Sequence, residues 1–382
     1  MFELSGEHET FRKVVRDFAE RELAPHVAQW DREHRLPIEV VHAMGELGLF
    51  GLNVPDEFGG GGGDFTSLCL AIEEIGRVDQ SLGATLEAAV GLGINPILSY
   101  GTDEQKQRWL PDLVAGRALA GFGLTEPEAG SDAGATRTRA ALADGQWTIN
   151  GAKAFITNSG TSITSLVTVT ARTGDDEISA IIVPSGTPGF IVEPAYEKLG
   201  WHISDTHGLT FDDCRVPEDN LLGRRGDGFR QFLAVLDDGR IAISALAVGL
   251  AQGCLDASVK YANERHTFGA PLGSRQSVAF ALSDLAVSVE AARLLTYKAA
   301  WLKDAGRPSV EIKQAASIAK LFSSDAAMNA TRTATQVFGG NGFMEEFPVA
   351  RFYRDAKILE IGEGTSEVQR MLIARGLGLP VR

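Results

Sequence analysis

The sequence predicts a mostly α-helical protein in which a small all-β domain separates two helical domains. Three observations predict this fold class. Apolar residues recur at three- and four-residue steps in 1–117, short β-rich runs lie between turn residues in 118–226, and a helical period returns in 227–382. At 382 residues the chain is too long for one compact core, which agrees with several domains that share buried surface.

The N-terminal domain, residues 1–117, should begin with one amphipathic helix over about 5–30. Its apolar positions, among them Phe11, Val15 and Phe18, fall on one helical face. Gly- and Pro-containing breaks such as VPDEFGGGGGD separate the shorter helices that follow. We expect those helices at 37–47, 65–77, 81–99 and 103–114.

The middle domain, residues 118–226, has the short runs of a β-domain, and the C-terminal domain, residues 227–382, has segments of the length found in helical bundles. We expect strands at 147–149, 154–156, 166–170, 180–183, 190–192 and 209–211. We expect helices at 228–263, 276–305, 310–337 and 363–375.

Composition narrows the classes of function. Acidic residues outnumber basic ones by 50 to 36, giving a formal charge of -14, whereas a non-specific hold on nucleic acid needs a basic face. We therefore expect no nucleic-acid partner, although backbone amides and a few arginines can still bind an anionic cofactor.

The three cysteines lie far apart without a CxxC pair, so neither a zinc site nor a disulfide framework is indicated. For His202 and His207 we expect surface or packing roles, and we expect no metal.

Targeting signals are also missing from the sequence. No apolar run approaches the roughly 18 residues that suggest a membrane span. The start, MFELSGEHETFRK, has no feature of a signal or transit peptide. We expect a cytoplasmic protein without a membrane partner, or a mitochondrial matrix protein if the chain is a processed eukaryotic form.

The chemistry must come from segments that match no standard signature, since GxGxxG after a strand, GxxxxGK[ST], GxSxG and HExxH are all absent. Five polar, Gly-rich segments at domain junctions remain: GFGLTEPEAGSD, KAFITNSG, ERHTFG, QVFGGNGF and EIGEGTSEVQR. Together with VPDEFGG, DEQKQRWLP, DDCRVPEDNLLG and RDAKILEIGEGTSE, they resemble the acyl-CoA dehydrogenase family over the whole chain. That family has an N-terminal α-helical domain, a β-barrel-like middle domain and a C-terminal four-helix bundle, the order expected above from periodicity.

The resemblance implies FAD as the cofactor. In the family, the segment from Phe122 to Ser131 holds the flavin ring, and Ser131 lies where flavin and the acyl-CoA phosphates meet. Taken alone, that segment is also what a loop joining two domains looks like. The matching flavin contacts in the middle domain are Phe122, Leu124, Thr125, Ser131, Phe155, Ile156 and Thr157.

A second set of matching residues lies in the C-terminal domain, and in the family part of it contacts the flavin across a subunit boundary. Arg265 would supply a charged fork for phosphate, although alone it would pass for a solvated charge at a helix end. Gly339 and Gly340 would let a neighbouring chain approach diphosphate, although alone they would be a helix stop. The set comprises Arg265, Thr267, Phe268, Gln276, Gln336, Val337, Gly339, Gly340, Gly364, Thr365 and Glu367.

Glu363 is the expected catalytic base. An α-hydrogen of a thioester is weakly acidic, so a base must lie within hydrogen-bond reach and be partly desolvated. Gly362 and Gly364 on either side permit a close backbone approach, so that the Glu363 amide can donate to the thioester carbonyl. The alternative is that Glu363 caps the final helix.

The substrate side is expected around the same residue. Another branch of the family places its glutamate at the position of Gly239, so Glu363 has no rival here. We expect Asp237, Arg240, Gly364 and Ser131 to contact the substrate, although Asp237 and Arg240 can also form an ordinary ion pair. Gly362 stands where many relatives have an aromatic residue, which suggests room for a branched, cyclic or longer acyl group.

The resemblance therefore implies α,β-dehydrogenation of a fatty-acyl-CoA to a trans-2-enoyl-CoA by a homotetramer, a dimer of dimers, with electron-transferring flavoprotein as acceptor. Two alternatives stay open. One is an acyl-CoA oxidase or a flavin monooxygenase on the same fold, although oxidases are commonly longer and monooxygenases usually lack the glutamate. The other is a non-catalytic binding protein such as the DNA-associated relatives, which carry basic surfaces.

Overall fold

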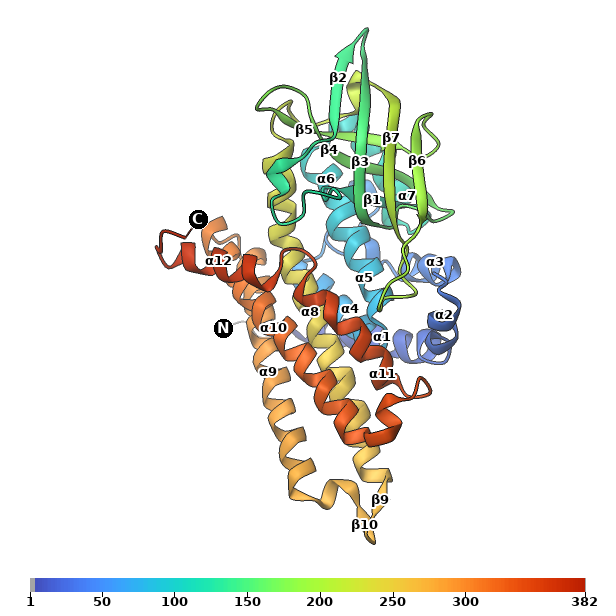
Figure 1. The fold of residues 1–382 in the computed structure, drawn as a ribbon, viewed down its shortest axis with the longest axis vertical. Helices are drawn as coiled ribbons and strands as arrows, with labels where there is room; N and C mark the ends of the chain where they lie inside the picture. The colour runs from blue at the N-terminus through green and yellow to red at the C-terminus, as the bar shows by residue number, and fades with distance from the viewer. Residues whose placement is uncertain (1–3, 382) are drawn as a thin grey trace.

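The computed structural model describes residues 4–381, and helices fill both ends of this range (Figure 1). The single helix expected over 5–30 is wrong: α1 spans Gly6–Phe18, a π-helical turn follows at Ala19–Leu23, and α2 starts a new helix at Val27–Glu33. Pro25 accounts for the break, because proline has no N–H to donate and its ring collides with the preceding turn. The expected helices at 37–47 and 103–114 are confirmed as α3, Ile38–Glu46, and α7, Asp103–Val114.

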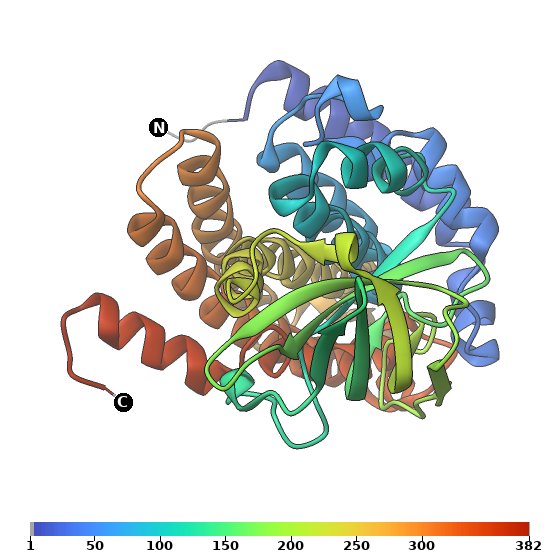
Figure 2. The same cartoon turned by 90° about the horizontal axis from the view of Figure 1, so that it is seen from above.

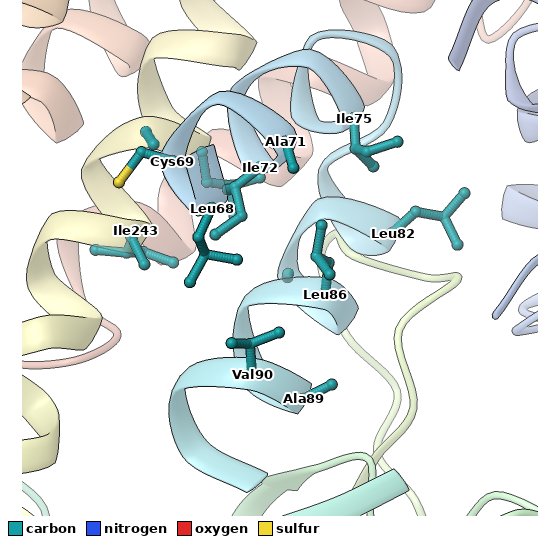
Figure 3. Close-up of a cluster of buried hydrophobic side chains, with 14 of the residues drawn as sticks. Leu68, Cys69, Ala71, Ile72, Ile75, Leu82, Leu86, Ala89, Val90 and Ile243 are labelled. Atoms are coloured by element: carbon teal, nitrogen blue, oxygen red, sulfur yellow. The ribbon is translucent and has the colours of Figure 1, made fainter. Parts of the chain in front are cut away.

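The centre of the N-terminal domain is a nearly continuous buried helix. α4 spans Phe65–Val78, and the segment expected as one helix over 81–99 is α5, Gln80–Glu87, then a π-helical stretch, Ala88–Ile94, and α6, Asn95–Tyr100. Gln80–Tyr100 is the one helix among the described residues that is long and apolar enough, by length and composition, to cross a membrane, and 83% of its apolar window is buried inside the protein. Side chains of this segment pack on α4 and on Ile243 (Figure 3), as a core helix does.

The middle domain is one twisted sheet with its own apolar core. Its strand order is β6-β7-β3-β2-β4-β5-β8, and β1 pairs in parallel with β4. The runs expected at 147–149 and 154–156 form one strand, because backbone pairing with β7 continues through Gly151 and Ala152. The strands are β1 Leu119–Gly123, β2 Arg139–Ala143, β3 Gln146–Thr157, β4 Thr164–Arg172, β5 Ile178–Pro184, β6 Phe190–Ala195, β7 Thr206–Pro217 and β8 Leu221–Leu222.

Three long helices dominate the C-terminal domain. The last expected helix, 363–375, begins three residues later than expected, and α11 lies in a segment where no helix was expected. In both views α12 projects away from the body of the molecule (Figures 1 and 2). The elements are α8 Gly228–Glu264, β9 His266–Thr267, β10 Ala270–Pro271, α9 Gln276–Asp304, α10 Ser309–Phe338, α11 Pro348–Ala356 and α12 Ser366–Gly376.

The long helix α8 connects the two ends of the molecule (Figure 1). The β-domain lies at one end, and the short β9–β10 hairpin lies at the opposite end, where α8 passes into α9 (Figure 1). One large apolar core runs through the N-terminal helices and the C-terminal bundle, and a smaller one lies inside the sheet. α8 packs against both helical domains and is therefore the element that positions the site.

Candidate functional site

Glu363 lies in a tight turn between α11 and α12. Its φ is 54° and that of Gly364 is 95°, so two consecutive residues adopt the left-handed region that L side chains avoid. Thr365 caps α12, since its hydroxyl accepts a hydrogen bond from the Val368 amide at 3.3 Å. Glu363 therefore does not cap the final helix, and its carboxylate is available for another role.

The carboxylate of Glu363 points at the backbone of α8. A Cβ built on Gly239 would lie 2.4 Å from Oε2 of Glu363, so this glycine leaves the space that the carboxylate occupies. Oε2 is buried and accepts no hydrogen bond from an N–H or hydroxyl group in the described part of the chain. Burial raises the pKa of Glu363, while a hydrogen bond from Glu87 and the charges of Arg240 and Lys320 oppose that rise. A carboxylate in such surroundings has the properties of a general base.

Glu87 is a second acid at the site that the sequence analysis did not identify. It is the last residue of α5, its exposed fraction is 3%, and its Oε1 has no hydrogen-bond partner among residues 4–381. Burial first, and then the adjacent Glu363, raises the pKa of Glu87 well above its ordinary value. Two buried carboxyls in contact disfavour two negative charges, so each raises the tendency of the pair to keep a proton. A signal was present in the sequence, because Glu87 is the one charged residue in the apolar stretch SLGATLEAAVGLGI.

Arg240 and Asp237 lie in the same turn of α8 and form the ion pair that was the alternative reading of both. The guanidinium of Arg240 is buried and its Nε has no partner within residues 4–381. Burial raises the pKa of Asp237, against the attraction of Arg240 and then of Lys313, whose Nζ lies 3.6 Å away. Arg240 therefore forms the ion pair with Asp237 and also lies near the expected base, since its charge acts on Glu363.

The first of the expected flavin contacts of the middle domain packs on the helix that carries Gly239. Phe122, at the end of β1, stacks on Phe232 of α8 with ring centroids 4.0 Å apart, and Gly239 lies about two turns further along that helix. Thr125 and Ser131 lie in the loop after β1, and Leu124 is buried there.

Phe155 is the most conspicuous of the expected flavin contacts. It has a φ of 62° and an exposed fraction of 65%, and its ring lies 5.2 Å from that of Tyr196. Thr157 is half-buried at the end of β3. The side chain of Ile156 belongs to the core of the sheet, so only its backbone can reach a ligand.

A buried ion pair holds the two middle-domain motifs together. Lys153 Nζ donates to Glu126 Oε1 at 2.8 Å, and Glu126 accepts further hydrogen bonds from the amides of Arg137 and Thr138 at 2.6 and 3.1 Å. The Ala154 amide donates to the Thr125 carbonyl at 2.9 Å. The loop after β1 and the strand that carries Phe155 are therefore one rigid unit.

Gly364, Thr365 and Glu367 lie in the turn of Glu363 and at the start of α12, and the other expected contacts lie at the far end of the bundle. The hairpin, the start of α9 and the end of α10 meet there, where Tyr261 stacks on Phe338 at 4.0 Å and accepts a hydrogen bond from Asn341 at 2.9 Å. By the rise of an α-helix, Arg265 lies roughly 40 Å along α8 from Gly239. One chain therefore does not bring these residues to the Glu363 site. They are Arg265, Thr267, Phe268, Gln276, Gln336, Val337, Gly339 and Gly340.

Both groups of residues have features that fit the expected flavin. Phe155 offers an exposed flat ring on the middle domain, and Phe268 is 96% exposed on the hairpin next to the exposed Arg265. Gly339 has a φ of 61°, and a Cβ on Gly339 or Gly340 would meet no atom of the chain within 4 Å. This open backbone can accept a phosphate or a neighbouring chain.

Comparison with known proteins agrees with this arrangement. Family models described as the N-terminal, middle and C-terminal domains of acyl-CoA dehydrogenase match residues 5–117, 121–214 and 226–378. The chain is 49% identical over 379 residues to a probable acyl-CoA dehydrogenase, YngJ, of Bacillus subtilis, covering 98% of this chain and 99% of that protein. It is 45% identical to the mitochondrial short-chain specific acyl-CoA dehydrogenase of Rattus norvegicus, covering 97% and 90% of the two chains. The butyryl-CoA dehydrogenase structure from Megasphaera elsdenii superimposes with a TM-score of 0.95 at 42% identity, over 99% of both chains.

Proposed function

Since the chain belongs to the acyl-CoA dehydrogenase family, we propose that it removes an α-proton and a β-hydride from a fatty-acyl-CoA, with Glu363 as the base. The family is FAD-dependent, and the chain is an enzyme of that family. The observation that carries the proposal is the buried carboxylate of Glu363, which has a raised pKa and lies against the bare backbone of Gly239.

The side chains of this site divide the work as follows. Bound FAD would supply the acceptor of the β-hydride, its N5 atom. The carboxylate of Glu363 takes the pro-R α-proton, and the Glu363 amide donates to the thioester carbonyl as negative charge develops there. Protonated Glu87 donates to the carboxylate and keeps a second negative charge away from it. The product is a trans-2-enoyl-CoA. The middle-domain residues Phe122, Leu124, Thr125, Phe155 and Thr157 hold the ring, and Ser131, Asp237, Arg240 and Gly364 contact the acyl-CoA.

Gly362 supports a substrate with a branched, cyclic or longer acyl group. By their names, the relatives from Rattus norvegicus and Megasphaera elsdenii act on short acyl chains and on butyryl-CoA. A Cβ at Gly362 would meet only two atoms of Ile358 within 4 Å, at 3.4 and 3.9 Å. The space where many relatives have an aromatic side chain is therefore open, next to the carbon from which the proton leaves.

The assembly that we propose is a homotetramer, a dimer of dimers. The flavin-contact residues at the hairpin are roughly 40 Å from Glu363 within one chain, so a second copy would have to bring them to the flavin. A stripe of exposed apolar residues at seven-residue spacing follows α9, which suits packing against another helix. The stripe consists of Phe280, Val287, Leu294 and Trp301.

Electron-transferring flavoprotein is the proposed electron acceptor, fatty-acid β-oxidation the proposed context and the bacterial cytoplasm the proposed location. We also keep 1–117, 118–226 and 227–382 as the proposed domain limits. Acyl-CoA oxidase or flavin monooxygenase activity is the alternative that the acceptor test addresses: slow reoxidation of the reduced enzyme by air counts against both.

Anaerobic reduction of the bound flavin tests the proposal. The purified yellow protein is mixed with short, medium and branched acyl-CoAs, and loss of the visible flavin absorbance is followed for wild type and Glu363→Gln. We expect one substrate group to bleach the flavin, and Glu363→Gln to bind FAD without bleaching. A protein without flavin, or a Glu363→Gln variant as fast as wild type, would show that the assignment is wrong and favour a non-catalytic binding protein.

A further inference from the structure

A buried lysine holds the turn that carries Glu363. Lys320 lies in the middle of α10 with an exposed fraction of 1%, and its Nζ donates to the carbonyl of Gly364 at 2.8 Å. Gln369 donates to the same carbonyl at 3.0 Å and to that of Glu363 at 3.3 Å. An ammonium group without solvent is costly unless compensating contacts offset its burial. The hydrogen bond to the Gly364 carbonyl is one such contact, and it joins the buried ammonium group to the turn that carries Glu363.

The turn needs such contacts because its backbone is strained. Glu363 has a left-handed φ, which a residue with a side chain keeps only when the surroundings enforce it. The turn is attached to a helix, α12, that projects from the body of the molecule (Figure 2). Lys320 of α10 and Gln369 of α12 donate hydrogen bonds to the carbonyls of this turn, and these bonds hold its backbone in the left-handed conformation.

The charge of Lys320 acts on the carboxylate as well as on the turn. Four charged groups influence Lys320: Glu363 on the turn, Arg240 on α8, Asp325 on α10 itself and Glu360 before the turn. Burial is the largest effect and lowers the pKa of Lys320 to about 8, so the ammonium form dominates at neutral pH. The groups that act on Glu363 are Glu87, Arg240 and Lys320, and the last two are the cations that favour its ionised form.

We propose that Lys320 is a positioning residue of the dehydrogenation: its ammonium group holds the Glu363–Gly364 turn in place and keeps the base ionised. The inference rests on the proposed role of Glu363. Lys320 touches a backbone carbonyl and not the substrate, and so it acts through the base. Arg240 alone cannot replace it, because Arg240 forms its ion pair with Asp237 and makes no hydrogen bond to the turn.

Two variants separate the contact from the charge. Lys320→Met removes both, and Lys320→Gln keeps an N–H donor without the charge. Lys198→Met is the matched control, because Lys198 is another lysine whose pKa burial lowers to about 8 and whose Nζ donates to a carbonyl, that of Ser204, at 2.5 Å. Should Lys320→Met fail to fold, Lys320→Gln carries the test alone.

The first readout is hydrogen exchange of the backbone amides in 360–370, measured on the FAD-loaded proteins without substrate. We expect exchange in Lys320→Met to be about tenfold faster than in wild type, the effect of losing one hydrogen bond from a charged donor. Lys320→Gln should show a smaller increase and Lys198→Met none. Wild-type exchange in Lys320→Met, or in Lys320→Gln if only that variant folds, would overturn the proposal, whether or not Glu363 is the base.

The second readout is the pH dependence of flavin bleaching by the preferred acyl-CoA. Without the cation the pKa of Glu363 rises, so the acidic limb should move to higher pH by about one unit in both Lys320 variants and stay in place in Lys198→Met. An unmoved limb in variants that bind FAD would overturn the proposal. If wild type itself does not bleach, the proposed function has failed, and the exchange experiment still decides whether Lys320 holds the turn.

Discussion

Replacing Gly239 with alanine puts a methyl group where the carboxylate of Glu363 lies. The new Cβ would be 2.4 Å from Oε2, 2.9 Å from Cδ and 3.0 Å from Oε1 of Glu363. Since ordinary contacts lie near 3.5 Å, the carboxylate must retreat by about 1 Å. The carboxylate is the flexible end of a long side chain, so it moves more easily than the helix backbone of α8 does.

The magnitude follows from that displacement. A misplacement of about 1 Å of a reacting group costs about 100-fold in rate, so flavin bleaching by the preferred acyl-CoA should slow about 100-fold in Gly239→Ala. The fold should not suffer, because alanine in a helix is more stable than glycine by roughly 0.5–1 kcal/mol. We therefore expect slow chemistry in a protein whose melting temperature is unchanged or higher.

The assay is anaerobic stopped-flow bleaching with FAD content and melting temperature measured in parallel. Gly6→Ala is the control, because Gly6 begins α1 and a Cβ there meets no atom within 4 Å. Bleaching at the wild-type rate in Gly239→Ala, with FAD bound, would refute the reasoning: either the carboxylate does not occupy this position or Glu363 is not the base.

Three other perturbations have defined outcomes. Glu87→Leu removes the hydrogen bond that lowers the pKa of Glu363, so the acidic limb of the pH–rate profile of bleaching should move to higher pH. Glu87→Gln keeps a donor and should leave the acidic limb in place. An acidic limb at the same pH in both variants would contradict this prediction. Gly362→Tyr fills the open space beside the base and should lower the bleaching rate for branched relative to straight acyl-CoA about tenfold, and an unchanged ratio would remove Gly362 from the acyl site. Burial raises the pKa of Asp355 from 3.8 to about 7, so protonation of Asp355 stabilises the fold at low pH, and this stabilisation is lost as pH rises through about 7. Asp355→Asn should therefore raise the melting temperature at about pH 8 and give no gain at about pH 4. An equal change in melting temperature at both pH values would refute the predicted sign.

The order of domains was predictable because hydrophobic periodicity is local. Helices such as α4 and α8 and strands such as β4 and β5 were expected close to their positions in the structure. β1 and β2 were not expected, because β1 is buried on both faces and β2 is mostly exposed, so neither alternates clearly. The helix over 5–30 was expected to be continuous because its apolar period outweighed the one proline in it.

The candidate site was predictable only in part. Glu363, Arg240 and the flavin-contact motifs were identified because short ordered segments carry them. Glu87 and Lys320 were missed. The charge of Glu87 in an apolar stretch was a signal that it has a role, but nothing near either residue shows that it faces Glu363. Ile156 was expected beside the cofactor, but its side chain packs inside the sheet.

The sequence by itself determined the three-part order and the family, and it predicted Glu363 as the base, since position 239 is glycine. Only the tertiary structure decided what that glutamate can do. Its pKa depends on burial and on charges that act through space, and the groups responsible come from α5, α8 and α10. The structure likewise separated the expected flavin contacts into two sets at opposite ends of α8, because a straight helix of 37 residues keeps its ends apart.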